Sequence, residues 1–106
     1  MKFGHIAVLG AALIGLAGAA VANAHQPRLK GSELARHARI NLASARMTAL
    51  KARPGIITDQ ELKREPGGTG LRYSFDITSH GKPFEVGVDA ATGAVLENVA
   101  EGKHPD

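Results

Sequence analysis

Histidine is the residue type in this chain best suited to binding a metal ion, and four histidines follow residue 24. They are His25, His37, His80 and His104. Neutral imidazole is a common metal ligand, but ligands usually lie three or four residues apart on one element. No two of these histidines have that spacing, so we expect no bound metal and no cofactor. A copper ion held by a new amino terminus at His25 is the alternative, and it would need a second ligand that the sequence does not indicate.

Nucleophilic and acid–base catalysis find little support in the remaining residues. The chain has no cysteine, and Ser74 lies inside a predicted strand rather than in a strand–turn–helix elbow. Asp59 and Glu61 would share one face of a strand, which is more typical of a soluble edge than of paired catalytic carboxylates. The Gly-Gly-Thr-Gly run at 67–70 lacks the lysine and the following helix of a phosphate loop. We therefore expect the protein not to be an enzyme.

Basic residues form the one pattern that could mark a partner surface. Residues 25–53 contain a single acid, Glu33, among seven basic residues: Arg28, Lys30, Arg36, Arg39, Arg46, Lys51 and Arg53. Residues 54–106 instead carry nine acidic and five basic residues, so the two halves could attract one another across a solvated surface. The alternative is an external partner, bound by Arg36, Arg39 and Arg46. Anionic lipid or an acidic protein suits these residues, whereas nucleic acid is not expected because no aromatic residue is interleaved to stack bases.

The first 24 residues have the three parts of a cleavable signal peptide in the correct order. Lys2 supplies a positive charge, Ile6 to Val21 is uncharged and apolar, and Ala22-Asn23-Ala24 places small residues where a signal peptidase reads the chain. A retained membrane anchor is the alternative, but a spanning helix needs roughly 20 apolar residues. We therefore expect cleavage between Ala24 and His25, and a bacterial protein that is periplasmic or secreted.

Residues 32–52 have the apolar spacing of an amphipathic helix. Apolar side chains recur every three or four residues, at Leu34, Ala38, Leu42, Ala45, Ala49 and Ala52. Asn41 can cap a helix that begins at Leu42, so the sequence leaves open whether the segment forms one helix or two. Pro54-Gly55 should end the helix, because proline disfavours helical geometry at Arg53 and glycine tolerates a left-handed turn.

An apolar period of two after residue 55 predicts strands. Leu71, Tyr73, Phe75 and Ile77 alternate with polar residues, and Phe84, Val86 and Val88 follow. The turn residues between these runs predict an antiparallel hairpin, and residues 56–65 read as a weaker preceding strand. A tight turn at 89–93 leads into a last strand at 95–99. Its key residues are Asp89, which can bond backbone amides, Thr92, and Gly93, which can take a positive φ.

The order of these elements resembles the PepSY domain. The most specific part is Val88-Asp89-Ala90-Ala91-Thr92-Gly93-Ala94-Val95-Leu96, and Lys51-Ala52-Arg53-Pro54-Gly55 at the end of the alanine-rich helix supports it. The resemblance covers residues 40–99 and leaves 25–39 as a basic N-terminal segment and 100–106 as a flexible tail. It implies an α+β, cystatin-like fold in which a helix packs on a three- to four-stranded antiparallel sheet.

The resemblance also implies a noncatalytic module that binds a protein. PepSY domains are found in propeptides of thermolysin-like metallopeptidases and in many exported bacterial proteins. The first hypothesis is therefore a module that restrains or inhibits a peptidase in the cell envelope, through a sheet edge or the open sheet face. The second is a sensor or accessory module that binds anionic lipid or a signalling partner through its basic helix. Salt should weaken binding by arginine and lysine but not edge pairing.

Overall fold

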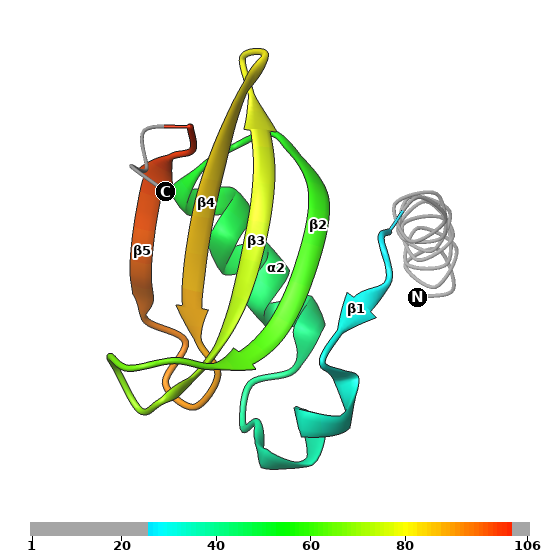
Figure 1. Ribbon diagram of the computed structural model, residues 1–106, viewed down its shortest axis with the longest axis vertical. Helices are drawn as coiled ribbons and strands as arrows, with labels where there is room; N and C mark the ends of the chain where they lie inside the picture. Colours follow the sequence, from blue (N-terminus) through cyan, green and yellow to red (C-terminus); the bar gives the residue numbers. More distant parts are fainter. Residues whose placement is uncertain (1–25, 103–106) are drawn as a thin grey trace, which may run out of the picture.

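A computed structural model gives the fold of residues 26–102, in which one α-helix lies against one face of a five-stranded sheet (Figure 1). The elements in chain order are β1 (Leu29–Lys30), the 3-10 helix η1 (Ser32–His37), α2 (Leu42–Ala52), β2 (Ile56–Arg64), β3 (Leu71–Ser79), β4 (Lys82–Asp89) and β5 (Val95–Ala100). The α+β class expected from the sequence is confirmed.

The sheet has the order β1-β2-β3-β4-β5, so neighbours in space are also neighbours in sequence. β2 to β5 are antiparallel, whereas β1 pairs parallel with β2 through Leu29↔Gln60 and Lys30↔Glu61. The expected three- to four-stranded antiparallel sheet is therefore wrong in strand number and in this one pairing. A strand of two residues carries no period that a sequence pattern can show.

The predicted helical segment consists of two elements separated at residues 38–41. Asn41 is the N-cap of α2, and its Oδ1 accepts a hydrogen bond from the Ser44 N–H at 2.8 Å, which confirms the predicted cap. Between the two helices, the N–H groups of Arg39 and Ile40 both donate to the carbonyl of Ala90, at 2.9 and 2.8 Å. These bonds attach the helix connection to the turn after β4.

Gly55 is required for a reason other than the predicted left-handed turn. The helix ends at Ala52, as expected from the proline, but Gly55 is not among the glycines with positive φ. A Cβ atom at this position would instead collide with the backbone carbonyl of Thr78 on β3. The glycine thus allows the chain to pass close to β3 as it enters β2.

The core lies between α2 and the inner face of the sheet. α2 packs across β3, β4 and β5, while η1 lies against β2. β3 supplies Phe75 and Ile77, and the helix contributes the small side chains of Ala45 and Ala49, all of which are buried. Alanine at these positions lets the helix lie close to the strands.

β2 contains a bulge at Thr58, where its register with β3 steps from Ile57 to Asp59. The extra residue shifts the alternation of side chains, so Gln60 and Leu62 face the core together with Ile57. This shift explains why the sequence of the strand shows only a weak period of two.

Candidate functional site

Asp89 is a buried carboxylate that joins the loop before β3 to the turn after β4. It accepts hydrogen bonds from the N–H and hydroxyl of Thr69, at 2.7 and 2.8 Å, and from the N–H groups of Ala91 and Thr92, at 2.8 and 3.0 Å. Gly93 completes the turn with φ of 80° and donates its N–H to the Asp89 carbonyl at 2.9 Å. The three residues expected to form the turn are therefore linked by hydrogen bonds, since Thr92 and Gly93 both donate to Asp89.

The hydrogen bonds of Asp89 favour its ionised form. Burial by itself would raise the pKa of this carboxyl, but the bonds from Thr69, Ala91 and Thr92 outweigh burial and hold the pKa well below its usual range. All of these donors belong to the chain itself. The geometry thus gives Asp89 a structural role, and it leaves the partner surface to be found elsewhere.

The three arginines expected to bind a partner lie in different environments. Arg46 of α2 is half-buried, and its Nη1 donates to Oε1 of Gln60 at 2.7 Å. Arg36 is exposed, and its Nε donates to His37 Nε2 at 3.3 Å. Arg39 is exposed in the connection between η1 and α2. The structure therefore leaves Arg36 and Arg39 available at the surface and uses Arg46 inside the fold.

Gln60 is a buried polar residue that the sequence pattern does not mark. It accepts from Arg46 on one side, and its Nε2 donates to the carbonyl of Pro27 on the other. One side chain of β2 thus holds both α2 and the segment that leads into β1. Only the bulge at Thr58 reveals that Gln60 faces the core, so the sequence pattern carried no signal for it.

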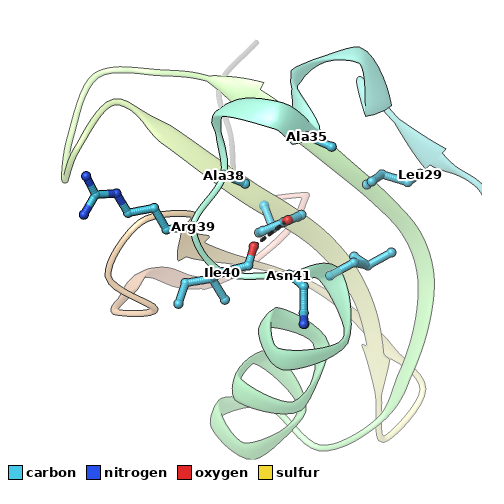
Figure 2. A pocket seen from close by; sticks show the side chains of 8 residues that line it. Leu29, Ala35, Ala38, Arg39, Ile40 and Asn41 are labelled. Carbon is cyan, nitrogen blue, oxygen red and sulfur yellow. Dashed lines mark hydrogen bonds between the residues drawn. The ribbon is translucent and has the colours of Figure 1, made fainter.

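A pocket of about 230 Å³ opens between η1 and the start of α2 (Figure 2). Its apolar lining comes from β1, η1, the connection after it and the first residue of α2: Leu29, Ala35, Ala38, Ile40 and Leu42. Tyr73 of β3 also lines the pocket, and its hydroxyl donates to the carbonyl of Ile40 at 2.7 Å, the dashed line in Figure 2. Burial raises the pKa of this phenol. The bond fixes the helix connection to the sheet.

β5 forms an open edge of the sheet. In the part of the chain that the structure describes, no strand pairs with its outer side, whereas β1 covers part of the β2 edge. Its two valines, Val95 and Val99, are 43% and 39% exposed. A strand with this exposure is a candidate for pairing with another chain.

The side chains considered for metal binding and catalysis do not come together in one site within residues 26–102. His37 ends η1 and His80 lies in the β3–β4 turn, and Figure 1 places these two elements at opposite ends of the molecule. Within residues 26–102, no group of three or more His, Cys, Asp or Glu residues is arranged to hold a metal ion. Ser74 donates to Glu85 at 2.9 Å on the outer sheet face.

Several expectations concern residues outside the described range. The signal peptide, its cleavage site at Ala24 and His25, and His104 all lie outside residues 26–102 and stay predictions. Among the helices of residues 26–102, none is both long enough and apolar enough to span a membrane.

A comparison with known protein families gives one match. The family PepSY, described as the peptidase propeptide and YPEB domain, matches residues 39–98. The chain belongs to the PepSY family. No curated protein and no solved structure gives a significant match.

The PepSY match begins at Arg39, so it includes α2, β2, β3, β4 and most of β5, whereas β1 and η1 precede it. PepSY domains are generally noncatalytic, mediate protein interactions with peptidases, and are typically extracellular or periplasmic. Membership therefore indicates a binding module of the peptidase-propeptide kind.

Proposed function

We propose that this PepSY chain is an exported, noncatalytic module that binds an extended segment of a peptidase along β5 and restrains the enzyme by steric occlusion. The observation that carries the proposal is the unpaired outer edge of β5 among residues 26–102. An added strand gains affinity from main-chain hydrogen bonds, so this kind of binding requires no particular reactive side chain.

The composition of β5 supports its use as a binding edge. Sheet edges are usually guarded by lysine, by proline or by a covering element. β5 has neither lysine nor proline, and Val95 and Val99 are exposed on it. Its one charged residue, Glu97, pairs with Arg72 of the sheet, and its bulge lies before Glu97, so residues 97–100 form a regular edge. The opposite edge differs, since β1 covers part of β2 and the end of β2 carries Lys63 and Arg64. We therefore assign the partner to β5.

The ladder between β4 and β5 indicates which backbone groups are free. The Glu101 N–H donates to the Pro83 carbonyl at 3.0 Å, and the register places Val99 opposite Glu85 two residues further along. In an antiparallel ladder alternate residues bond to the neighbouring strand. The backbone groups of Asn98 and Ala100 therefore point away from β4 and can pair with an added strand.

A titration against envelope peptidases of the host tests the proposal. The protein is purified from cells that express the full chain, its amino terminus is read by mass spectrometry, and hydrolysis of a peptide substrate is followed at two salt concentrations. Ala100→Pro removes the outward N–H and is tolerated at a strand edge, while Ala100→Val keeps the N–H and serves as the control. We expect salt-resistant, saturable inhibition that Ala100→Pro weakens about tenfold, the effect of one lost hydrogen bond.

Two results would contradict this function. If the intact chain does not inhibit any of these peptidases, or is itself digested rapidly, it does not restrain them. If Ala100→Pro inhibits as well as Ala100→Val, the partner does not pair with β5.

One observation favours a second function, that of an envelope-surface sensor or accessory module. The ion pairs formed within residues 26–102 include neither Arg28, Arg36 nor Arg39. Cations without a carboxylate partner are available to anionic lipid. Binding to vesicles that contain phosphatidylglycerol, lost between low and moderate salt, would support this function over edge pairing.

A further inference from the structure

The pocket beside η1 is built jointly by the PepSY region and by the segment before it. Leu29, Ala35 and Ala38 precede residue 39, where the family match begins, while Ile40, Leu42 and Tyr73 lie within it. The segment is held in place by the pairing of β1 with β2 and by the Gln60 bond to Pro27. The hollow therefore exists only because the N-terminal segment packs against the PepSY region.

The size and lining of the pocket suit one apolar side chain. Alanine at positions 35 and 38 leaves the space open, and the volume is about 230 Å³. A cavity of about 150 Å³ with an apolar lining holds benzene, whereas sites for whole small molecules usually span about 300–1,000 Å³. A leucine or phenylalanine side chain is thus of suitable size, and a long acyl chain is too large.

The charged residues of η1 and of the connection after it are Glu33, Arg36 and Arg39, a set with a net positive charge. Arg39 is itself among the lining residues, and Arg36 follows Ala35 on η1. Both arginines are exposed, and neither takes part in an ion pair within residues 26–102. Figure 2 shows the Arg39 side chain extending away from the hollow. It can therefore pair with a charged group of a ligand whose apolar part occupies the pocket. No acidic residue lines the pocket in the described part of the chain.

We propose that this pocket takes an apolar side chain from an acidic segment of the protein partner, with Arg36 and Arg39 pairing with carboxylates on either side of it. The inference rests on the proposed binding of a protein and adds a second contact, at the end of the molecule near η1. Apolar burial would supply the affinity, and the arginines would select an acidic sequence over a basic one.

Peptide titrations followed by amide NMR shifts test the inference on the protein purified from cells that express the full chain. The probes are blocked pentapeptides with a central leucine and four flanking glutamates, with a central leucine and four flanking lysines, or with a central glycine and four flanking glutamates. We expect the first to shift amides of residues 29–42 saturably and to bind about three- to tenfold tighter than the second. The glycine peptide should not saturate.

Matched variants separate the pocket from the general charge of the surface. Ala35→Leu fills the pocket, and Ala43→Leu makes the same change at an exposed position of α2 that does not line it. Arg39→Gln removes one cation, and Lys82→Gln removes an exposed one at the start of β4, beside the β3–β4 turn at the opposite end of the molecule (Figure 1). We expect Ala35→Leu to abolish saturable binding and Arg39→Gln to weaken it about threefold, with both controls unchanged. Unchanged amide spectra away from the substituted residue show that each variant is folded.

Three outcomes would contradict the proposed binding of an acidic segment in this pocket. They are equal binding of the glutamate- and lysine-flanked leucine peptides, binding that Ala35→Leu leaves intact, and binding of phosphatidylglycerol vesicles at residues 29–42 without binding of the peptide. The peptidase titration keeps this failure distinct from failure of the proposed function. If the Ala35→Leu variant inhibits the peptidase normally while the Ala100→Pro variant does not, the proposed binding at the pocket is wrong and the proposed pairing with β5 is supported.

Discussion

Thr69 and Asp89 form a two-point contact that joins the loop before β3 to the end of β4. The N–H and the hydroxyl of Thr69 donate to the two carboxylate oxygens of Asp89, at 2.7 and 2.8 Å. Gly68, the neighbour of Thr69, has φ of 56°, and a Cβ atom there would collide with the same carboxylate. The glycine-rich run that resembled a phosphate loop thus wraps around an anion of the chain itself.

Replacing this carboxylate should strongly destabilise the fold. Asp89→Asn removes the charge and turns one acceptor into a donor that faces other donors. We expect the free energy of unfolding to fall by about 2–4 kcal/mol, because buried hydrogen bonds to a charged group are lost. Urea unfolding at pH 7 measures the change. Glu33→Gln, at an exposed carboxylate of η1 that forms none of the ion pairs within residues 26–102, is a control that should cost much less, and a similar loss in both variants would contradict the assigned role of Asp89.

The low pKa of Asp89 also predicts how stability depends on pH. The pKa of this carboxyl is lower in the folded chain than its ordinary value of 3.8, so the unfolded chain binds the proton first as pH falls. Its contribution is therefore complete above about pH 5 and declines as the pH falls further. The difference in unfolding free energy between wild type and Asp89→Asn should shrink from pH 5 to pH 3. A constant difference over this range would show that ionised Asp89 is not the cause.

Tyr73 should contribute through its hydroxyl as well as its ring. The ring is buried, and the hydroxyl donates to the Ile40 carbonyl at 2.7 Å, between η1 and α2. Tyr73→Phe keeps the packing and loses this bond, so we expect a loss of about 1–2 kcal/mol in the free energy of unfolding. Hydrogen exchange should locate the effect, with faster exchange at Arg39 and Ile40, whose N–H groups bond to Ala90. Unchanged exchange there would show that the bond does not fix the connection.

Asp76 lies between carboxylates of both neighbouring strands, and the Lys30 ammonium is the cation that interacts with it. It faces Asp59 on β2 and Glu85 on β4 in register, and its carboxylate takes part in none of the hydrogen bonds or ion pairs within residues 26–102. Like charges directly opposite each other are destabilising, so Asp76→Asn should raise the unfolding free energy by about 0.2–1 kcal/mol at low salt.

Asp59→Asn is the matched control for this prediction. It relieves the same repulsion but breaks the ion pair between Asp59 and Lys30, 2.9 Å apart, so its net gain should be smaller. Added salt should reduce the gain of Asp76→Asn, because the charges are partly exposed and screened. An equal gain in the two variants, or one that does not depend on salt, would argue against repulsion as the cause.

Local rules accounted for the elements that depend on neighbouring residues. The cap at Asn41, the end of α2 before Pro54 and the β3–β4 hairpin each follow from residues within a few positions of one another. The faces of β3 followed from its period of two, although Arg72 on its outer face is buried rather than exposed. Its guanidinium lies over Gly87, which has no side chain to fill that space, and bonds the Pro66 carbonyl at 3.1 Å.

The features that make up the candidate sites depend on contacts between distant segments. The pocket requires η1 to lie against β2, so that Ala35 of η1 and Tyr73 of β3 line the same hollow, and β1 exists only because Leu29 and Lys30 meet β2 about 30 positions later. The bulge at Thr58 decides that Gln60 is buried and can hold both Arg46 and Pro27. Sequence patterns report the period of one segment, and they do not report which segment it will meet.

The sequence by itself determined the α+β class, the positions of the main helix and of four strands, and the resemblance to PepSY, because these depend on side-chain period, capping and turn chemistry. Only the tertiary structure decided that β5 is the open edge, that Arg46 bonds Gln60 while Arg39 stays exposed, and that a pocket lies between β1, η1 and the start of α2. An edge, a buried polar pair and a hollow are properties of packed surfaces. They arise from the way in which separate elements meet.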